Sequence, residues 1–79
     1  MNDNERILMK IGILLREIRL ALSYTQSDLE SKGINRTLIS RVESGKYNIT
    51  IGSLMRILDC YGITASDFFD NKSGFFNDF

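Results

Sequence analysis

Residues 34–46 predict a short amphipathic helix whose polar groups could bind nucleic acid. Ile39 and Val42, three positions apart, form its narrow apolar face. The opposite face carries two cations and two hydroxyls, namely Arg36, Thr37, Ser40 and Arg41. Arginine can bond bidentately to a guanine edge, and a serine or threonine hydroxyl can donate or accept a hydrogen bond. Such a face suits a DNA groove, although the same residues would also make an ordinary solvated helix face.

Both ends of this segment carry residues that bound a helix. Asn35 is suited to the N-cap, because its side-chain oxygen can accept a hydrogen bond from an otherwise unpaired backbone N–H. Gly45 follows the last apolar residue and can take a positive φ at little cost, which ends the helix. The polar face is therefore expected on a short helix with well-defined ends.

Four further helices are expected around this one, and the fold class is all-α. Helical spacing predicts a long helix over residues 3–22, containing Gly12, with the apolar stripe Ile7, Leu8, Ile11, Leu14, Leu15, Ile18 and Leu22. Thr25 and Asp28 have capping-box spacing at the start of a short helix that ends at Gly33. Thr50 and Thr64 cap the last two predicted helices. No segment alternates as a strand does, and residues 25–45 have the layout of a helix-turn-helix.

Composition limits the chain to one small domain. Its 79 residues, 43% hydrophobic and 25% charged, are typical of an ordered globular domain. No apolar run reaches the length of a membrane span and the first residues lack a signal-peptide layout, so the cytoplasm is the expected location. Cys60, the single cysteine, is expected in the core, which leaves no internal disulfide. Without histidine a zinc site is not expected, nor is a cofactor or a small-molecule substrate.

Charge is balanced overall but uneven along the chain. The formal net charge is zero and the pI is about 6.2, which counts against a nucleic-acid-binding domain. Residues 32–46 nevertheless hold four cations, Lys32, Arg36, Arg41 and Lys46, and one acid, Glu43. Residues 59–79 hold four acids and one cation. A local basic face can still bind phosphates when the acidic end is turned away.

Residues 71–79 form a phenylalanine-rich tail. Phe75, Phe76 and Phe79 would leave large apolar area in water if the tail were extended. Burial of one such side chain stabilises a protein by about 1.5–3 kcal/mol. The tail is therefore expected to pack, either on its own core or on a partner.

The order of these parts resembles the Xre family, the lambda-repressor and Cro-like helix-turn-helix domains of phage repressors and bacterial regulators. The resemblance covers roughly residues 11–70, and it rests on residues 16–19, 24–29, 39–46, 50–58 and 61–69 in the family order. It implies a five-helix, lambda-repressor-like fold for residues 1–70. It also implies binding to double-stranded DNA, with the second helix of the motif in the major groove.

The resemblance assigns roles to particular residues. Those facing base edges would be Arg36, Thr37 and Arg41, with Asn35 and Ser40 beside them. Those contacting the DNA backbone would be Gln26, Ser44, Lys46 and Asn48. Arg19 and Glu43 match a family pair that forms a salt bridge between the first helix and the recognition helix, a structural role.

The chain departs from the family pattern at three places. Ser23 stands where the family usually has glycine, which removes an easy left-handed turn. Glu30 stands where the family usually has alanine, which puts a charge where a small residue normally packs. The chain is also one residue shorter between Leu29 and Ile39 than the commonest pattern, a spacing similar to that of peptide-pheromone-responsive regulators.

The first hypothesis for function is a transcriptional regulator that binds DNA as a homodimer. A single short helix reads only a few base pairs, and dimers bind half-sites one helical turn, about 34 Å, apart. With no other domain available for dimerisation, the predicted interface is the aromatic set Phe68, Phe69, Phe75, Phe76 and Phe79. Relatives of this size include phage repressors, restriction–modification controller proteins and antitoxins, among which the residues do not discriminate.

Two other classes of function compete with this hypothesis. A helical protein-interaction module of the same fold, without DNA binding, is motivated by the zero net charge, Glu30 and the aromatic tail. An enzyme is less consistent with the sequence, because histidine is absent and Cys60 lies on a core-like helix. No glycine-rich phosphate-binding loop is present either.

Overall fold

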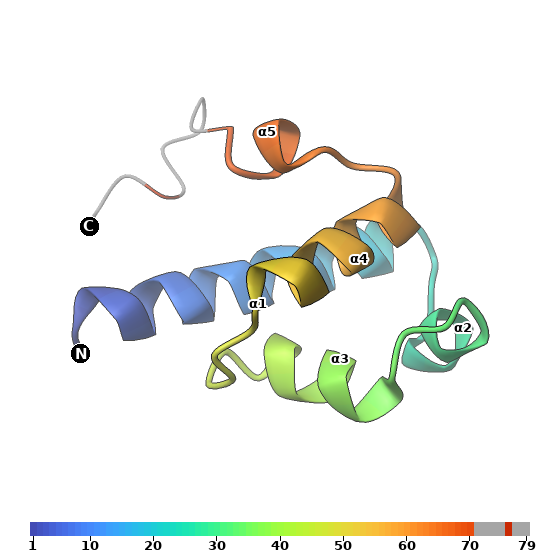
Figure 1. The fold of residues 1–79 in the computed structure, drawn as a ribbon, viewed down its shortest axis with the longest axis horizontal. Helices are drawn as coiled ribbons and strands as arrows, with labels where there is room; N and C mark the ends of the chain where they lie inside the picture. Colours follow the sequence, from blue (N-terminus) through green and yellow to red (C-terminus); the bar gives the residue numbers. More distant parts are fainter. Residues whose placement is uncertain (71–75, 77–79) are drawn as a thin grey trace.

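The computed structural model describes residues 1–70 and residue 76 (Figure 1). Within these residues the fold is all-α, as predicted, and no strand is present. Its helices are α1 (Asp3–Ala21), α2 (Gln26–Ser31), α3 (Arg36–Glu43), α4 (Ile51–Tyr61) and α5 (Ala65–Phe68). Figure 1 shows α2 and α3 on one side of the long α1, and α5 on the other side. None of the described helices is long and apolar enough to cross a membrane.

Each helix begins at a residue whose side-chain oxygen accepts a backbone N–H. These N-caps are Asn2, Thr25, Asn35, Thr50 and Thr64. The cap at Thr25 is reciprocal, because the backbone N–H of Thr25 donates to the Asp28 carboxylate at 2.7 Å while Asp28 N–H donates to Thr25 Oγ1 at 3.0 Å. The hydrogen bond from the Thr25 backbone lowers the pKa of Asp28. These local bonds explain why the helix starts agree closely with the sequence prediction.

The core is shared among α1, α2, α3 and α4. Its most deeply buried side chains are Leu15, Leu29, Ile39, Ile57 and Leu58. Phe68 of α5 is also buried, and Phe76 packs on this core from beyond the helices. The structure therefore buries at least one apolar side chain from every helix in a single cluster.

Two expectations for buried residues were wrong. Leu22, predicted in the apolar stripe of α1, is 42% exposed, because it caps the helix and the chain turns away at Ser23. Serine in place of glycine at residue 23 was expected to remove an easy left-handed turn, but Ser23 adopts a φ of +59°. Cys60 is half-buried at the edge of the core rather than fully enclosed.

Gly12 lets α1 approach the end of α3 closely. A Cβ built at Gly12 would clash with the Val42 carbonyl oxygen and would lie 3.2 Å from the Gly45 backbone. Gly45 itself has a φ of +79° and a hypothetical Cβ there would lie 3.0 Å from Met9 Cα. The absence of a side chain at these two glycines therefore sets the distance between α1 and the end of α3.

We predict that Gly12→Ala destabilises the protein by roughly 1–3 kcal/mol, because overpacking outweighs the gain in helix propensity. The matched control is Gly52→Ala, since Gly52 lies in α4 with open space around its hypothetical Cβ. That control is expected to gain up to about 1 kcal/mol. Urea denaturation measures both variants, and equal stabilisation by both would refute the close approach at Gly12.

Candidate nucleic-acid interface

The helix-turn-helix consists of α2, a four-residue turn over residues 32–35, and α3. The turn passes through Gly33, which has a φ of +89°, and then buries Ile34 in the core. Ile34 N–H donates to the Leu29 carbonyl at 3.0 Å. Arg56 on α4 donates a guanidinium N–H to the Gly33 carbonyl at 2.9 Å, which ties the turn to α4. These contacts hold the turn in place.

Glu30, which stands where the family resemblance leads one to expect alanine, does not disturb the packing of α2. Glu30 lies on α2 and is exposed to solvent. Leu29 beside it is fully buried and supplies the contact with the core. The charge at residue 30 therefore stays in water and does not enter the contact between helices.

The polar face of α3 is open to solvent. Arg36, Thr37, Ser40 and Arg41 are all exposed, whereas Ile39 and Val42 are 1% and 3% exposed. Asn35 is exposed too, but its side-chain oxygen accepts N–H groups from Thr37 at 2.8 Å and Leu38 at 3.2 Å. Its amide nitrogen is the group that remains to donate to a ligand. The exposed surface of α3 thus presents three residues with N–H donors, Asn35, Arg36 and Arg41. It also presents the hydroxyls of Thr37 and Ser40.

The residues expected to contact the DNA backbone lie at two places beside α3. Gln26 begins α2 and is half-buried, and its Nε2 lies 3.5 Å from Glu43 Oε1. Ser44, Lys46 and Asn48 are exposed in and beside the loop that follows α3. Ser44 donates its hydroxyl proton to the Arg41 carbonyl at 2.6 Å, so it closes the end of α3. Among residues 44–48, the exposed cation is Lys46.

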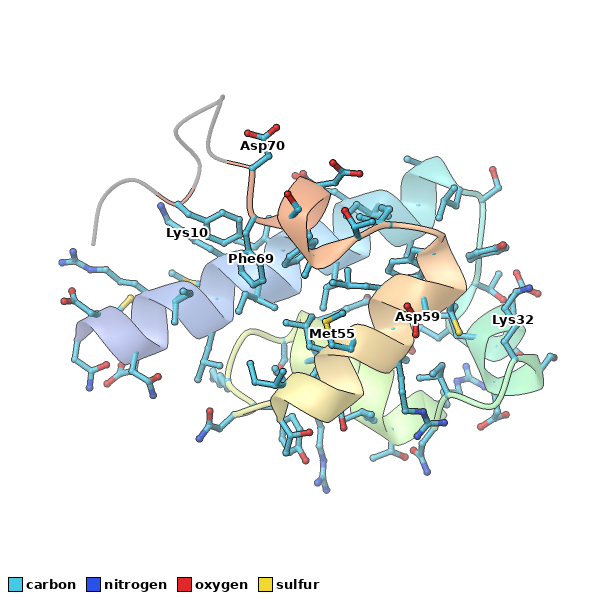
Figure 2. All side chains as sticks on the ribbon, turned by 45° about the horizontal axis from the view of Figure 1, so that its top comes forward. Lys10, Lys32, Met55, Asp59, Phe69 and Asp70 are labelled. Carbon is cyan, nitrogen blue, oxygen red and sulfur yellow. The ribbon has the colours of Figure 1, made fainter. Side chains whose placement is uncertain are left out.

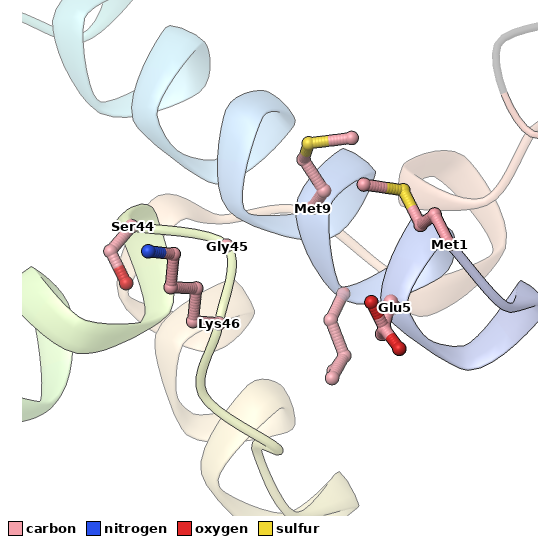
Figure 3. Close-up of a pocket in the computed structure, with 7 residues that line it drawn as sticks. Met1, Glu5, Met9, Ser44, Gly45 and Lys46 are labelled. Carbon is pink, nitrogen blue, oxygen red and sulfur yellow. The ribbon is translucent and has the colours of Figure 1, made fainter.

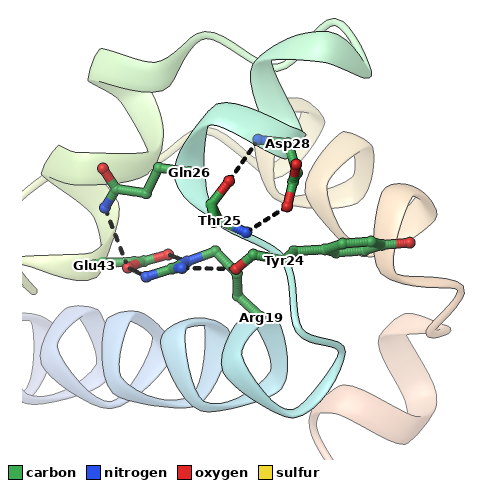
Figure 4. Close-up of polar contacts among 6 residues, drawn as sticks. All are labelled: Arg19, Tyr24, Thr25, Gln26, Asp28 and Glu43. Carbon is green, nitrogen blue, oxygen red and sulfur yellow. Dashed lines mark hydrogen bonds and ion pairs between the residues drawn. The ribbon is translucent and has the colours of Figure 1, made fainter.

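A nearly dry ion pair joins α1 to α3 (Figure 4). Arg19 Nε and Nη2 donate to the two Glu43 carboxylate oxygens at 2.7 and 2.9 Å. The remaining Arg19 nitrogen, Nη1, donates to the Tyr24 carbonyl at 2.9 Å. The side chains are 9% and 6% exposed, and the hydrogen bond to Glu43 raises the pKa of Arg19. The family pair proposed from the sequence thus acts as a strut that fixes the C-terminal end of α3.

Tyr61 contributes a second polar group to this region. Its hydroxyl is buried and, among the described residues, has no hydrogen-bond partner. Burial raises the pKa of Tyr61, because the charged phenolate would lose its hydration. Its ring lies 6.4 Å from the Tyr24 ring, measured between centroids. Tyr61 therefore packs in the core and does not belong to the exposed α3 surface.

Tyr47 is the surface residue that the sequence prediction missed. It is 37% exposed in the loop after α3, and it lines two shallow hollows together with Arg41. The signal available in the sequence was an aromatic residue two positions after the helix-ending Gly45. A third hollow, of about 360 Å³, lies between the first turns of α1 and residues 44–46 (Figure 3).

The residues predicted for a dimer interface are distributed differently. Phe68 is 3% exposed and packs inside its own chain. Phe76 lies 6.1 Å from the Phe68 ring and 5.3 Å from the Phe69 ring. Phe69 is 38% exposed, and Phe75 and Phe79 lie outside the described residues. Within the described part of the chain, Phe69 is thus the phenylalanine most available to a partner.

A family model described as helix-turn-helix matches residues 15–68, more than half of the chain, and spans α2, the turn and α3. The chain belongs to the Xre, or lambda-repressor-like, helix-turn-helix family. This family consists of DNA-binding regulators, so α2, α3 and their turn form a DNA-binding motif. No curated protein and no solved structure matches the chain significantly.

We predict that Glu43→Gln destabilises this helix-turn-helix protein by about 3–5 kcal/mol, because it leaves the Arg19 guanidinium buried without a counter-charge. The double variant Arg19→Met, Glu43→Leu is expected to recover most of that loss, since no unpaired charge remains. Glu30→Gln, an exposed change of the same kind, is the control. Urea denaturation compares the three, and a Glu43→Gln variant as stable as the control would contradict the strut.

Proposed function

We propose that the protein is a sequence-specific transcription regulator that binds double-stranded DNA as a homodimer. The observation that carries the proposal is α3, whose apolar face is buried while its cationic face is open to solvent. A recognition helix needs this combination, because it must be fixed on its domain while its side chains reach base edges.

The base-reading residues in this proposal are Arg36, Thr37 and Arg41, with Asn35 and Ser40 beside them. Each arginine can donate bidentately to guanine O6 and N7, and Thr37 can bond to a base or touch a thymine methyl. The backbone contacts in this proposal are Gln26, which lies beside Glu43 at the end of α3, and Ser44, Lys46 and Asn48, which follow that end in the chain. Contacts of this second kind set the register of the protein on the duplex without reading sequence.

The distribution of exposed charge supports binding to phosphates. Residues 32–46 contain one acid, Glu43, and Arg19 occupies its carboxylate away from water. The cations Arg36, Arg41 and Lys46 are exposed on the same stretch. A duplex approaching α3 would therefore meet positive charge, although the chain as a whole is neutral.

The homodimer in this proposal forms through apolar groups on α4 and after α5. Ile51 is 75% exposed, and Met55 lies one turn further along α4 at 36% exposed. Phe69, with Phe76 against it, adds aromatic area, and Met55 and Phe69 are both visible from one side of the molecule (Figure 2). Large exposed apolar side chains such as these suit a protein interface.

We predict that genomic DNA fragments captured by the purified protein share a two-fold symmetric motif with half-sites about ten base pairs apart. The double variant Arg36→Ala, Arg41→Ala should bind a duplex with this motif at least about 30-fold more weakly, because each specific arginine contact contributes about 1–3 kcal/mol. Fluorescence anisotropy at fixed salt measures the affinity.

The charge-matched control for this experiment is Arg6→Ala, Arg16→Ala, which removes two cations from the exposed surface of α1. It should weaken binding to the motif duplex and to a scrambled duplex by the same small factor. Failure to capture any motif at low salt would reject the proposed function, and the interaction module without DNA binding would replace it.

We predict that Ile51→Asp and Phe69→Ser each shift the protein from dimer to monomer, because a charge or the loss of a ring disrupts an apolar interface. Sedimentation velocity measures the change across a concentration series. Leu20→Asp serves as the control, since Leu20 is 53% exposed on α1 and is not part of the proposed interface. A dimer that survives both interface changes must associate through another surface.

A further inference from the structure

Two adjacent hollows open beside the recognition helix, and both are bounded by Arg41 and Tyr47. The first, of about 350 Å³, is lined by Asn35, Thr37, Leu38, Arg41 and Tyr47, and we call it the methyl hollow. The second, of about 310 Å³, is lined by Arg41, Ser44, Lys46 and Tyr47, and we call it the basic hollow. Because two residues belong to both linings, the hollows lie next to each other on the α3 side of the protein.

A hydrogen bond within the loop backbone holds Tyr47 in position. Ile49 N–H donates to the Tyr47 carbonyl at 3.0 Å, which closes a tight turn in the loop. Ile49 packs against the core and anchors this turn from below. The Tyr47 side chain nevertheless remains 37% exposed. A held backbone with an exposed aromatic ring is suited to contact a ligand, because little order is lost when the ligand binds.

The two hollows differ in chemistry. The basic hollow has the cations of Arg41 and Lys46 and no acid in its lining, so it suits a phosphate. The methyl hollow shares Arg41 with the basic hollow but lacks Lys46, and its lining adds the apolar Leu38 and the polar Asn35 and Thr37 to Tyr47. Its neighbours are the residues of α3 that face base edges in the proposed function. The apolar group that DNA presents to such residues in the major groove is the C5-methyl of thymine.

We propose that the methyl hollow receives a thymine methyl group and that Tyr47 is a specificity-determining residue of the DNA interface. The ring packs on the methyl group against Leu38, while Lys46 holds the neighbouring phosphate in the basic hollow. This inference rests on the proposed function, because it needs α3 in the major groove. It adds a reading of one base pair per half-site by a residue outside the recognition helix.

The test replaces each thymine of the motif duplex in turn by deoxyuridine, which lacks only the methyl group. The probe is a fluorescein-labelled duplex carrying the motif recovered from captured genomic fragments. For the unchanged protein, one thymine per half-site should lose about three- to fivefold in affinity when its methyl group is removed, as expected for one buried carbon. Tyr47→Ala should abolish this loss at that position, and Tyr47→Phe should keep it because the ring remains.

The outcomes separate the inference from the proposed function. Suppose that the protein binds the motif duplex but Tyr47→Ala leaves the loss of affinity caused by each deoxyuridine unchanged. The proposal that the methyl hollow receives a thymine methyl group is then rejected, whereas the proposal of DNA binding stands. The same conclusion follows if Tyr47→Ala weakens motif and scrambled duplexes equally, because the ring then contacts only the backbone. If no motif is captured at all, both proposals fall. Circular dichroism of Tyr47→Ala should show intact helices, because this side chain is exposed.

Discussion

The placement of α3 depends on the ion pair between Arg19 and Glu43. The eight-residue α3 is too short to be stable alone, so its position must come from contacts with the rest of the domain. Removing two charges from water costs several kcal/mol, and only complete hydrogen bonding offsets that cost. Here the Arg19 guanidinium donates hydrogen bonds to both Glu43 carboxylate oxygens and to the Tyr24 carbonyl oxygen. The pair therefore fixes α3 on α1 and, through Tyr24, fixes the chain that leads into α2.

Close packing on the same helix makes this pair possible. Gly12, Leu15 and Arg19 are spaced at i, i+3 and i+7, so they share one face of α1. Gly12 admits the Val42 carbonyl, the adjacent residue Glu43 meets Arg19, and Leu15 is buried between these contacts. A side chain at residue 12 would move the end of α3 outward and lengthen bonds that need short distances. The close packing at Gly12 and the ion pair at Arg19 therefore depend on each other, because both need the end of α3 to lie close to α1.

Local signals in the sequence predicted the helix boundaries well, because an N-cap is a bond between neighbours. Asn35 and the box of Thr25 and Asp28 are examples, and their bonds form as the spacing indicated. Features that depend on distant segments were beyond such signals. The sequence left open whether Gly12 allows close packing, and it placed an aromatic residue at Tyr47 without indicating that its side chain is exposed beside α3. Leu22 fitted the periodicity of α1 but lies where the chain has already begun to turn.

Net charge is the composition value most easily misread in this protein. A formal charge of zero argues against nucleic-acid binding only if every charge faces solvent equally. The Glu43 side chain is 6% exposed, and its carboxylate is paired with the Arg19 guanidinium. The Lys32 ammonium lies 5.2 Å from the centroid of the Tyr24 ring, and Lys32 remains exposed to solvent. The strut that positions α3 therefore also removes the one acid of residues 32–46 from the surface. Folding itself makes this surface basic, which the composition of the chain does not reveal.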